Sequence, residues 1–434
     1  MTVTAAAPGQ ASPSYRYLVV TILMVVYTFN FLDRQILSIL AEPIRQDLHL
    51  SDTQLGVLTG LAFAIFYTGF GIPVAWLADR ANRVRIIAAA CAIWSLFSAA
   101  CGLAGNFVQL LLCRIGVGVG EAGGSPPSYS LISDYFPPQD RGKGLAIYSL
   151  GVPFGSMVGS AAGGWIAANY GWRTAFYAVG LPGVLLALIL LIVVREPKRG
   201  VLDIPADGQG EHEPTPPLAE AVARFFRNRT LTITAFSSGL SAFVGYAVLT
   251  WAPPFLIRVK GMGLEEVALY YSLVLGITGA IGTFGAGWLV DRLSRADPRW
   301  YAFVPALAFA VSIPCFIGFL MAPSWPLALL CFAGPALLNN MYLAPALAVV
   351  QNAAPPAMRT VSGAILLFVL NIIGLGGGPV FVGMVSDRAA AEFGEASLQI
   401  GLAALIPVIC LTIAAHWLAS RAIGRGVRAA AAVG

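Results

Sequence analysis

Charge is scarce in this sequence of 434 residues. Lys, Arg, Asp and Glu together make up 11% of the chain, whereas 58% of its residues are apolar. A soluble domain carries roughly 25% charged residues, so the composition excludes an ordinary soluble enzyme and also a disordered chain. The 26 basic residues are dispersed along the chain and leave a net charge of only +5. This dispersion excludes a nucleic-acid partner.

Histidine and cysteine are also rare. The three His residues are scattered, and the six Cys residues all lie in apolar stretches without a spacing typical of a disulfide framework or a metal site. The chain contains no Gly-x-x-x-x-Gly-Lys-Ser/Thr loop, which argues against an ATP-driven pump. The sequence therefore predicts neither a metal nor another cofactor.

Long apolar stretches dominate what remains. A membrane-spanning helix needs about 20 mostly apolar residues, and the chain contains twelve such stretches. They predict an all-α integral membrane protein with twelve transmembrane helices. The stretches cover residues 17–40, 54–78, 86–104, 107–134, 143–168, 172–194, 230–257, 265–291, 302–321, 326–350, 358–386 and 395–422.

One long hydrophilic interval, residues 195–229, divides the stretches into six and six. Most basic residues fall in the loops on the same side as this interval, so the positive-inside rule places the interval and both termini in the cytoplasm. We expect a short amphipathic helix over 217–227 within it. The predicted organisation is a cytoplasmic tail (1–16), a six-helix bundle (17–194), the central linker (195–229), a second six-helix bundle (230–422) and a second cytoplasmic tail (423–434).

Two loops echo each other at half the chain length. The loop after the second stretch runs from Ala75 to Arg83, and the loop after the eighth runs from Gly287 to Arg295. Each carries an Asp-Arg pair and a second Arg three residues later. Repeats at half length are common in transporters, whose substrate sites lie between the repeats. The echo predicts two pseudo-symmetric bundles.

The repeated Gly-x-x-x-Asp-Arg-x-x-Arg pattern resembles a motif of the major facilitator superfamily. The first copy departs from it, with Ala75 for the opening Gly and Asn82 for a later Gly. A closer resemblance, to the Spinster family of lysophospholipid and sphingolipid transporters, lies in three segments: Asn30-Phe-Leu-Asp-Arg34, Gly116-Val-Gly-Val-Gly-Glu121 and Ser133-Asp-Tyr-Phe-Pro137. The resemblance implies the facilitator fold and transport of a lipid-like substrate.

Four charged residues lie deep inside the predicted spans: Asp33, Arg34, Arg114 and Glu121. A charge at the bilayer centre costs at least about 2.5 kcal/mol. Arg114 and Glu121 are seven residues apart and share a helix face. The first and fourth spans can therefore present two acids and two arginines at similar depth, with Asn30 one turn away on the first span.

We interpret these residues as a proton-coupling centre. Burial favours the neutral form of a carboxyl group and a neighbouring Arg favours the charged form, so Asp33 and Glu121 are the candidate protonation sites. Arg34 or Arg114 can exchange its carboxylate partner for an anionic substrate, because guanidinium binds phosphate and carboxylate in a bidentate manner. The alternative is that these residues form static ion pairs that fix helix packing.

The second bundle lacks such charge, and its spans carry weakly polar and aromatic residues instead. Asn339, Tyr342 and Asn371 are its candidate substrate-binding or coupling residues, together with Asn30, Arg34 and Arg114 of the first bundle. Arginines on one wall and aromatic groups on the other suit an amphipathic anion. The repeated loops hold candidate cytoplasmic gate residues, or loops that merely enforce topology; these residues are Asp79, Arg80, Arg83, Asp291, Arg292 and Arg295.

The leading hypothesis is a monomeric secondary transporter that works by alternating access and draws energy from a proton gradient. Its expected partners are protons, membrane lipid and an amphipathic or anionic small molecule. A carrier of a small polar anion, such as an organic acid or a sugar phosphate, is the alternative. A membrane-embedded enzyme and a channel are less favoured alternatives. The enzyme would need a polar catalytic cluster, and the channel would need rings of like charge, whereas the sequence offers paired opposite charges. The short loops fit a bacterial inner membrane.

Overall fold

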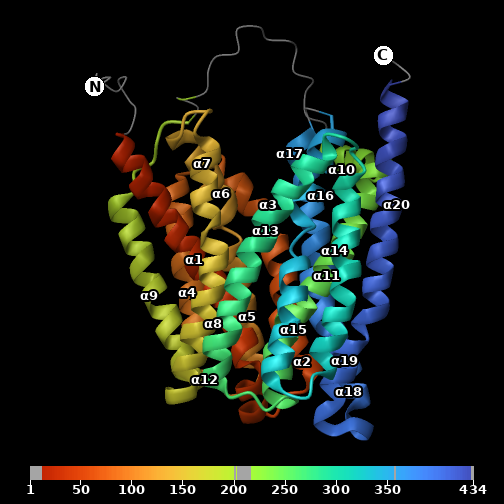
Figure 1. The fold of residues 1–434 in the computed structure, drawn as a ribbon. Helices are drawn as coiled ribbons and strands as arrows, with labels where there is room; N and C mark the ends of the chain where they lie inside the picture. The colour runs from red at the N-terminus through yellow and green to blue at the C-terminus, as the bar shows by residue number, and fades with distance from the viewer. Residues whose placement is uncertain (1–11, 200–201, 203–216, 356–357, 432–434) are drawn as a thin grey trace, which may run out of the picture. The chain divides into compact units, whose positions relative to one another are not determined.

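The apolar stretches fold into helices in the computed structural model, which describes residues 12–199, 202, 217–355 and 358–431 (Figure 1). Within these ranges the secondary structure is helical, with no strand. Most of the predicted N-terminal tail, residues 203–216 of the predicted linker and the last three residues of the predicted C-terminal tail lie outside the described ranges. The helix predicted over 217–227 is present as α10 (Leu218–Arg227), which buries Ala221 and Phe225 on one face.

Eleven helical segments of the described chain are long and apolar enough to cross a membrane. The first ten correspond one to one to the first ten predicted stretches, and the eleventh, Arg359–Arg425, holds the last two. The other segments are Pro13–Leu48, Asp52–Ala78, Arg83–Cys101, Phe107–Tyr135, Arg141–Tyr170, Trp172–Val193, Arg229–Arg258, Leu264–Ser294, Trp300–Met321 and Trp325–Ala353.

The eleventh segment contains two passes, because the chain reverses inside it. Gly394 has a φ of 53°, a left-handed conformation that glycine adopts without steric cost. The helices on its two sides, α18 and α19, pack against each other. The segment comprises α17 (Arg359–Val369), η4 (Leu370–Gly377), α18 (Gly378–Phe393), η5 (Gly394–Ala396), α19 (Ser397–Ala403) and α20 (Leu405–Ala431).

Several other segments are interrupted by π-helical or broken turns. Corresponding segments of the two sequence halves each carry a π-helix near their start, η1 (Val57–Leu61) and η2 (Val267–Tyr271). Single π-helical turns inside α-helices occur frequently at functional sites. The remaining interrupted elements are α2 (Asp52–Gly56), α3 (Ala62–Ala78), α5 (Phe107–Glu121), α6 (Ser125–Tyr135), α7 (Arg141–Ser149), α8 (Gly151–Tyr170), α12 (Leu264–Glu266), α13 (Ser272–Ser294), α15 (Trp325–Leu338) and α16 (Leu343–Ala353).

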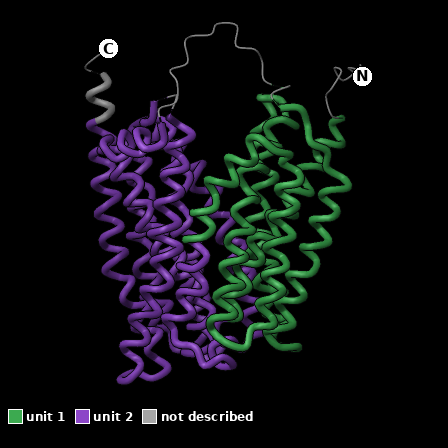
Figure 2. Tube along the Cα trace, turned by 180° about the vertical axis from the view of Figure 1, so that it is seen from behind, with its two compact units in different colours: residues 1–40, 65–209 green, residues 41–64, 210–434 purple. Residues whose placement is uncertain are grey.

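The uninterrupted elements are α1 (Pro13–Leu48), α4 (Arg83–Cys101), α9 (Trp172–Val193), α11 (Arg229–Arg258) and α14 (Trp300–Met321). The chain forms two compact units (Figure 2). Unit 1 comprises Met1–Leu40 and Ile65–Gln209, and unit 2 comprises Ala41–Ala64 and Gly210–Gly434. Unit 2 therefore includes the last turns of α1, which follow the first predicted span, and the start of the second predicted span, in addition to the later spans.

Glycines of the fifth span allow α8 to approach α1 closely inside unit 1. A Cβ atom added at Gly155 would overlap the carbonyl oxygen of Thr28, and one added at Gly159 would lie 2.8 Å from the Cα atom of Leu32. Small residues allow such backbone approach between membrane helices. The glycines of this span, which begins with the run Gly151-Val-Pro-Phe-Gly155 in α8, thus serve close helix packing, which positions α1.

We expect Gly155→Ala to lower the free energy of unfolding by about 1–3 kcal/mol, the usual cost of overpacking. The measurement is the thermal unfolding midpoint of the detergent-solubilised protein. Gly69→Ala is the matched control, because a Cβ atom there meets nothing within 4 Å. Equal midpoints for the two variants would contradict the close approach of α8 to α1.

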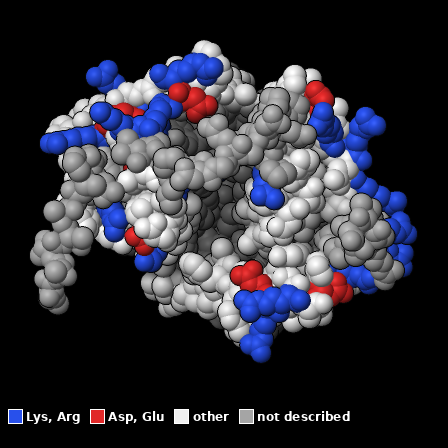
Figure 3. All heavy atoms as spheres, turned by 90° about the horizontal axis from the view of Figure 1, so that it is seen from above, with Lys and Arg blue, Asp and Glu red and all other residues white. Residues whose placement is uncertain are grey.

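A Trp-x-x-x-Arg pair whose guanidinium lies over the indole ring occurs at the C-terminal ends of α3 and α13 and within α20. The distances from the guanidinium carbon to the ring centroid are 4.2 Å for Arg80 and Trp76, 5.9 Å for Arg292 and Trp288, and 3.5 Å for Arg421 and Trp417. All three indole rings are exposed. Figure 3 shows one face of the molecule on which Lys and Arg side chains gather. Trp and Arg are typical of the membrane–water boundary.

Candidate functional site

Helices α1 and α5 of unit 1 bring the four predicted intramembrane charges into the protein interior. Asp33, Arg114 and Glu121 are each only 1% exposed. The glycine-rich end of α5 explains the depth of Glu121, because a Cβ atom at the preceding Gly120 would lie 2.6 Å from the backbone nitrogen of Trp94. The α5 backbone thus packs directly on α4 at this point.

Arg34 and Glu121 form an ion pair. The Nε atom of Arg34 donates a hydrogen bond of 2.6 Å to Oε2 of Glu121. The other carboxylate oxygen of Glu121 is buried and accepts no hydrogen bond from the described residues. The Glu121 side chain is fully buried, whereas 19% of the Arg34 side chain is exposed. The guanidinium is therefore the accessible member of the pair.

Aromatic rings flank the exposed part of Arg34. Its guanidinium carbon lies 5.0 Å from the ring centroid of Phe31 and 4.7 Å from that of Tyr67. Contacts of this kind stabilise a cation by up to about 2 kcal/mol when water is excluded. Arg34 therefore has a carboxylate on one side and apolar rings on another.

Asp33 points to a different neighbour. Its Oδ1 atom accepts a hydrogen bond of 2.6 Å from the hydroxyl group of Ser98 on α4. Asn30 lies one turn earlier on α1 and is buried, and its Oδ1 atom has no hydrogen-bond partner among the described residues. The two candidate acids thus have distinct environments, Glu121 beside a guanidinium and Asp33 beside a hydroxyl group.

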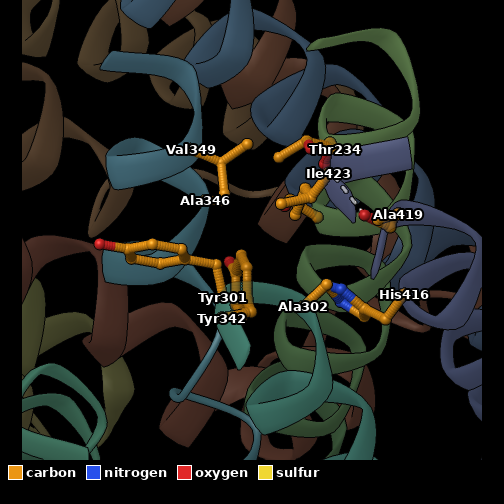
Figure 4. Close-up of a pocket in the computed structure, with 11 residues that line it drawn as sticks. Thr234, Tyr301, Ala302, Tyr342, Ala346, Val349, His416, Ala419 and Ile423 are labelled. Carbon is orange, nitrogen blue, oxygen red and sulfur yellow. Dashed lines mark hydrogen bonds between the residues drawn. The ribbon is translucent and has the colours of Figure 1, made fainter. Parts of the chain in front are cut away.

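The candidate residues of the second half lie in unit 2 and do not form one cluster. Asn339 and Tyr342 lie at the break between α15 and α16, and Asn371 lies in η4. Tyr342 lines a small pocket, shown in Figure 4, whereas Asn339 and Asn371 do not line it. The ring of His416 on α20 also lines this pocket and hydrogen-bonds to Ser241 at 2.7 Å.

The predicted gate residues differ in burial. Asp79, Arg80, Asp291, Arg292 and Arg295 are exposed at the ends of α3 and α13. Their role as a gate stays a prediction. Arg83, in contrast, is 1% exposed and lies among ion pairs within unit 1.

Arg83 joins three parts of unit 1. Its guanidinium forms ion pairs of 2.5 Å with Asp134 on α6 and of 2.7 Å with Glu196, which follows α9. The neighbouring Arg199 donates hydrogen bonds to the carbonyl oxygens of Ala78, Asp79 and Ala81. These carbonyl groups lie at and just beyond the C-terminal end of α3, where no further turn of helix satisfies them.

Sequence reasoning missed some of these partners. Ser98 carries no charge and stands in an apolar stretch with nothing to distinguish it. Glu196 was assigned to the linker, and its pairing with Arg83 is visible only in three dimensions. Groups of three or more His, Cys, Asp or Glu side chains that could hold a metal ion are absent from the described part of the chain.

Comparison with known proteins identifies the class. Residues 23–379 match the family model described as Major Facilitator Superfamily, so the chain belongs to this superfamily. It is a multi-pass membrane transporter of twelve helices and not an enzyme, which confirms the predicted fold and class.

Particular relatives give a finer placement. The chain is 33% identical to an MFS-type efflux pump of Mycolicibacterium smegmatis, over 96% of this chain and 95% of the relative. It is 27% identical to the hexuronate transporter of Bacillus subtilis (89% and 91%) and to human protein spinster homolog 1 (89% and 75%). A crystal structure described as a bacterial homolog of the human lysosomal transporter Spinster superposes with a TM-score of 0.86 at 33% identity, over 95% and 98% of the two chains. The chain is therefore homologous to the Spinster family, as its motifs predicted.

Proposed function

We propose that this protein is a proton-coupled secondary transporter that works by alternating access on an amphipathic or otherwise anionic organic substrate. The observation that carries the proposal is the buried pair of Arg34 and Glu121, in which a carboxylate is fully enclosed and its guanidinium partner is partly exposed. Charges inside membrane helices are costly and mark ion and proton pathways.

The pair supplies a simple coupling step. When a proton neutralises Glu121, the guanidinium of Arg34 loses its anionic partner and becomes available to an anionic substrate. When the substrate leaves, Arg34 again favours the charged form of Glu121 and the proton is released. Asp33, held by Ser98, is the second proton site. The proton gradient thereby drives transport, because the Glu121 carboxylate and the anionic substrate compete for the Arg34 guanidinium.

The surroundings of Arg34 favour a substrate that is partly apolar. Phe31 and Tyr67 stand beside the guanidinium, so an anionic head group on Arg34 would have aromatic carbon next to it. This arrangement agrees with a lysophospholipid-like or sphingolipid-like molecule, the class that the resemblance to the Spinster family implies.

A carrier of a small polar anion is the second candidate. It is favoured by the hexuronate transporter among the relatives, because a sugar acid offers Arg34 the same carboxylate without the apolar tail. For either substrate we propose a bacterial inner membrane, a monomer and cytoplasmic termini, the last supported by the basic loops of the sequence.

The test is substrate-dependent proton flux into proteoliposomes that contain the purified protein and a pH-sensitive dye. We expect flux with one of two panels, single-chain phospholipids and sphingoid phosphates or hexuronates and other organic acids. Protein-free liposomes are the control, since single-chain lipids also cross bilayers unaided. Uptake that is unaffected by collapse of the pH gradient would contradict proton coupling.

A further inference from the structure

A third copy of the Gly-x-x-x-Asp-Arg pattern ends the eleventh predicted span, as Gly383-Met-Val-Ser-Asp387-Arg388. The first two copies lie in loops on the predicted cytoplasmic side, whereas this copy lies at the opposite end of its span. In the structure Asp387 belongs to α18 and accepts hydrogen bonds from the backbone N–H groups of Asp52 (2.9 Å) and Thr53 (2.8 Å). It therefore caps the start of α2.

A buried arginine stands next to this cap. Arg258, at the end of α11, forms ion pairs of 2.7 Å with Glu42 of α1 and 2.8 Å with Asp52 of α2. The side chains of all three are at most 5% exposed. The Asp52 carboxylate also accepts a hydrogen bond of 2.6 Å from Ser386. A fully desolvated charge pair of this kind is strongly destabilised when one partner is lost.

The backbones of α2 and α18 touch beneath these charges. A Cβ atom at Gly56 would lie 2.6 Å from the carbonyl oxygen of Pro379, and one at Gly383 would overlap the carbonyl oxygen of Asp52. Polar caps, an ion-pair triad and close backbone packing thus occur at one place. They join residues 41–64, which comprise the connection between the first two predicted spans and the start of the second, to helices of the second sequence half, all inside unit 2.

We propose that Asp387, Arg258, Glu42 and Asp52 form a latch that closes the predicted outer end of the transport path and opens once in each cycle. The inference rests on the proposed alternating access, which requires that residues of the first two spans separate from the second half at this end. The latch consists of ion pairs and hydrogen bonds, which are strong while water is excluded. Water that enters this end competes for the same polar groups and weakens the latch. Because the backbones of α2 and α18 touch at Gly56 and Gly383, the two helices must separate together when the latch opens.

Hydrogen–deuterium exchange of the full-length protein in detergent tests the latch without any substrate. In Asp387→Ala we expect the exchange rates of amides 52–61 and 380–386 to rise together by about five- to ten-fold, because loss of a helix cap typically costs about 1 kcal/mol of local stability. Asp387→Asn should show a smaller rise, because Asn also caps helices well. Arg388→Ala is the matched control, since Arg388 is exposed beside Asp387.

The pattern of exchange decides between a latch and a local cap. A rise confined to amides 52–54 would mean that Asp387 only stops fraying of α2, and it would overturn the proposal. Arg258→Met should produce the same joint rise, and if this variant fails to fold, Asp387→Ala carries the test. Absence of proton flux in the liposome assay with the joint rise intact would refute the proposed coupling and leave the latch standing.

Discussion

Glu121→Gln should reduce gradient-driven uptake to the level of protein-free liposomes while exchange of substrate across the membrane continues. Gln keeps the size of the side chain but cannot carry the proton, so the competition for the Arg34 guanidinium no longer depends on pH. Exchange needs no net proton movement and is therefore expected to persist. The two measurements are uptake driven by a pH gradient and counterflow without one.

Two controls make this expectation sharp. Glu392→Gln removes an exposed carboxylate of α18 and should leave both activities unchanged. Glu121→Gln should also retain its thermal unfolding midpoint within a few degrees, because Arg34 is partly exposed and can be solvated by water. The coupling mechanism is wrong if Glu121→Gln and Asp33→Asn both keep full proton-driven transport.

Arg83→Met should strongly destabilise the protein. It leaves the carboxylates of Asp134 and Glu196 facing each other without their shared cation, and their side chains are only 10% and 21% exposed. Breaking a buried ion pair by removing one partner costs about 3 kcal/mol or more. We expect a correspondingly large fall in the unfolding midpoint, measured in detergent.

The triple variant Arg83→Met, Asp134→Asn, Glu196→Gln separates charge from packing. Neutralising both acids removes the uncompensated charge, so this protein should recover most of the lost stability, although some hydrogen bonds remain absent. If the triple variant is as unstable as Arg83→Met alone, the loss comes from packing of the Arg83 stem, and the ion pairs contribute little.

The sequence was a good guide to the fold because apolar length is a direct physical requirement of the bilayer. Each of the twelve predicted stretches has its helical pass, and the half-chain repeat correctly indicated the superfamily. The reversal at Gly394 was predictable as a short gap between apolar stretches. The π-helices η1, η2 and η4 were not predictable, because a single wide turn leaves the apolar composition of a helix unchanged.

The candidate site was predicted in part. Arg34 and Glu121 stood out because they are charged in the middle of apolar spans, and the structure brings them into contact. The latch residues were missed for the opposite reason. Glu42, Asp52 and Arg258 lie at span ends, where charge is expected, and only tertiary packing buries them. Sequence position within a span therefore identifies costly charges but not those that become costly on folding.

The Trp-x-x-x-Arg pairs at the ends of α3 and α13 and within α20 have a consequence for how the bilayer acts on this protein. Each unit carries at least one such pair, and each indole ring is about half exposed or more. An exposed Trp that lies against an Arg favours the headgroup level of the bilayer. Such a pair therefore anchors its part of the helix at that level. Tilting either unit would drag these side chains toward the hydrocarbon or away from it, at a cost of fractions of a kcal/mol per ångström of mismatch. Under the proposed alternating access, membrane thickness therefore affects the free energy of any tilting of the units during transport.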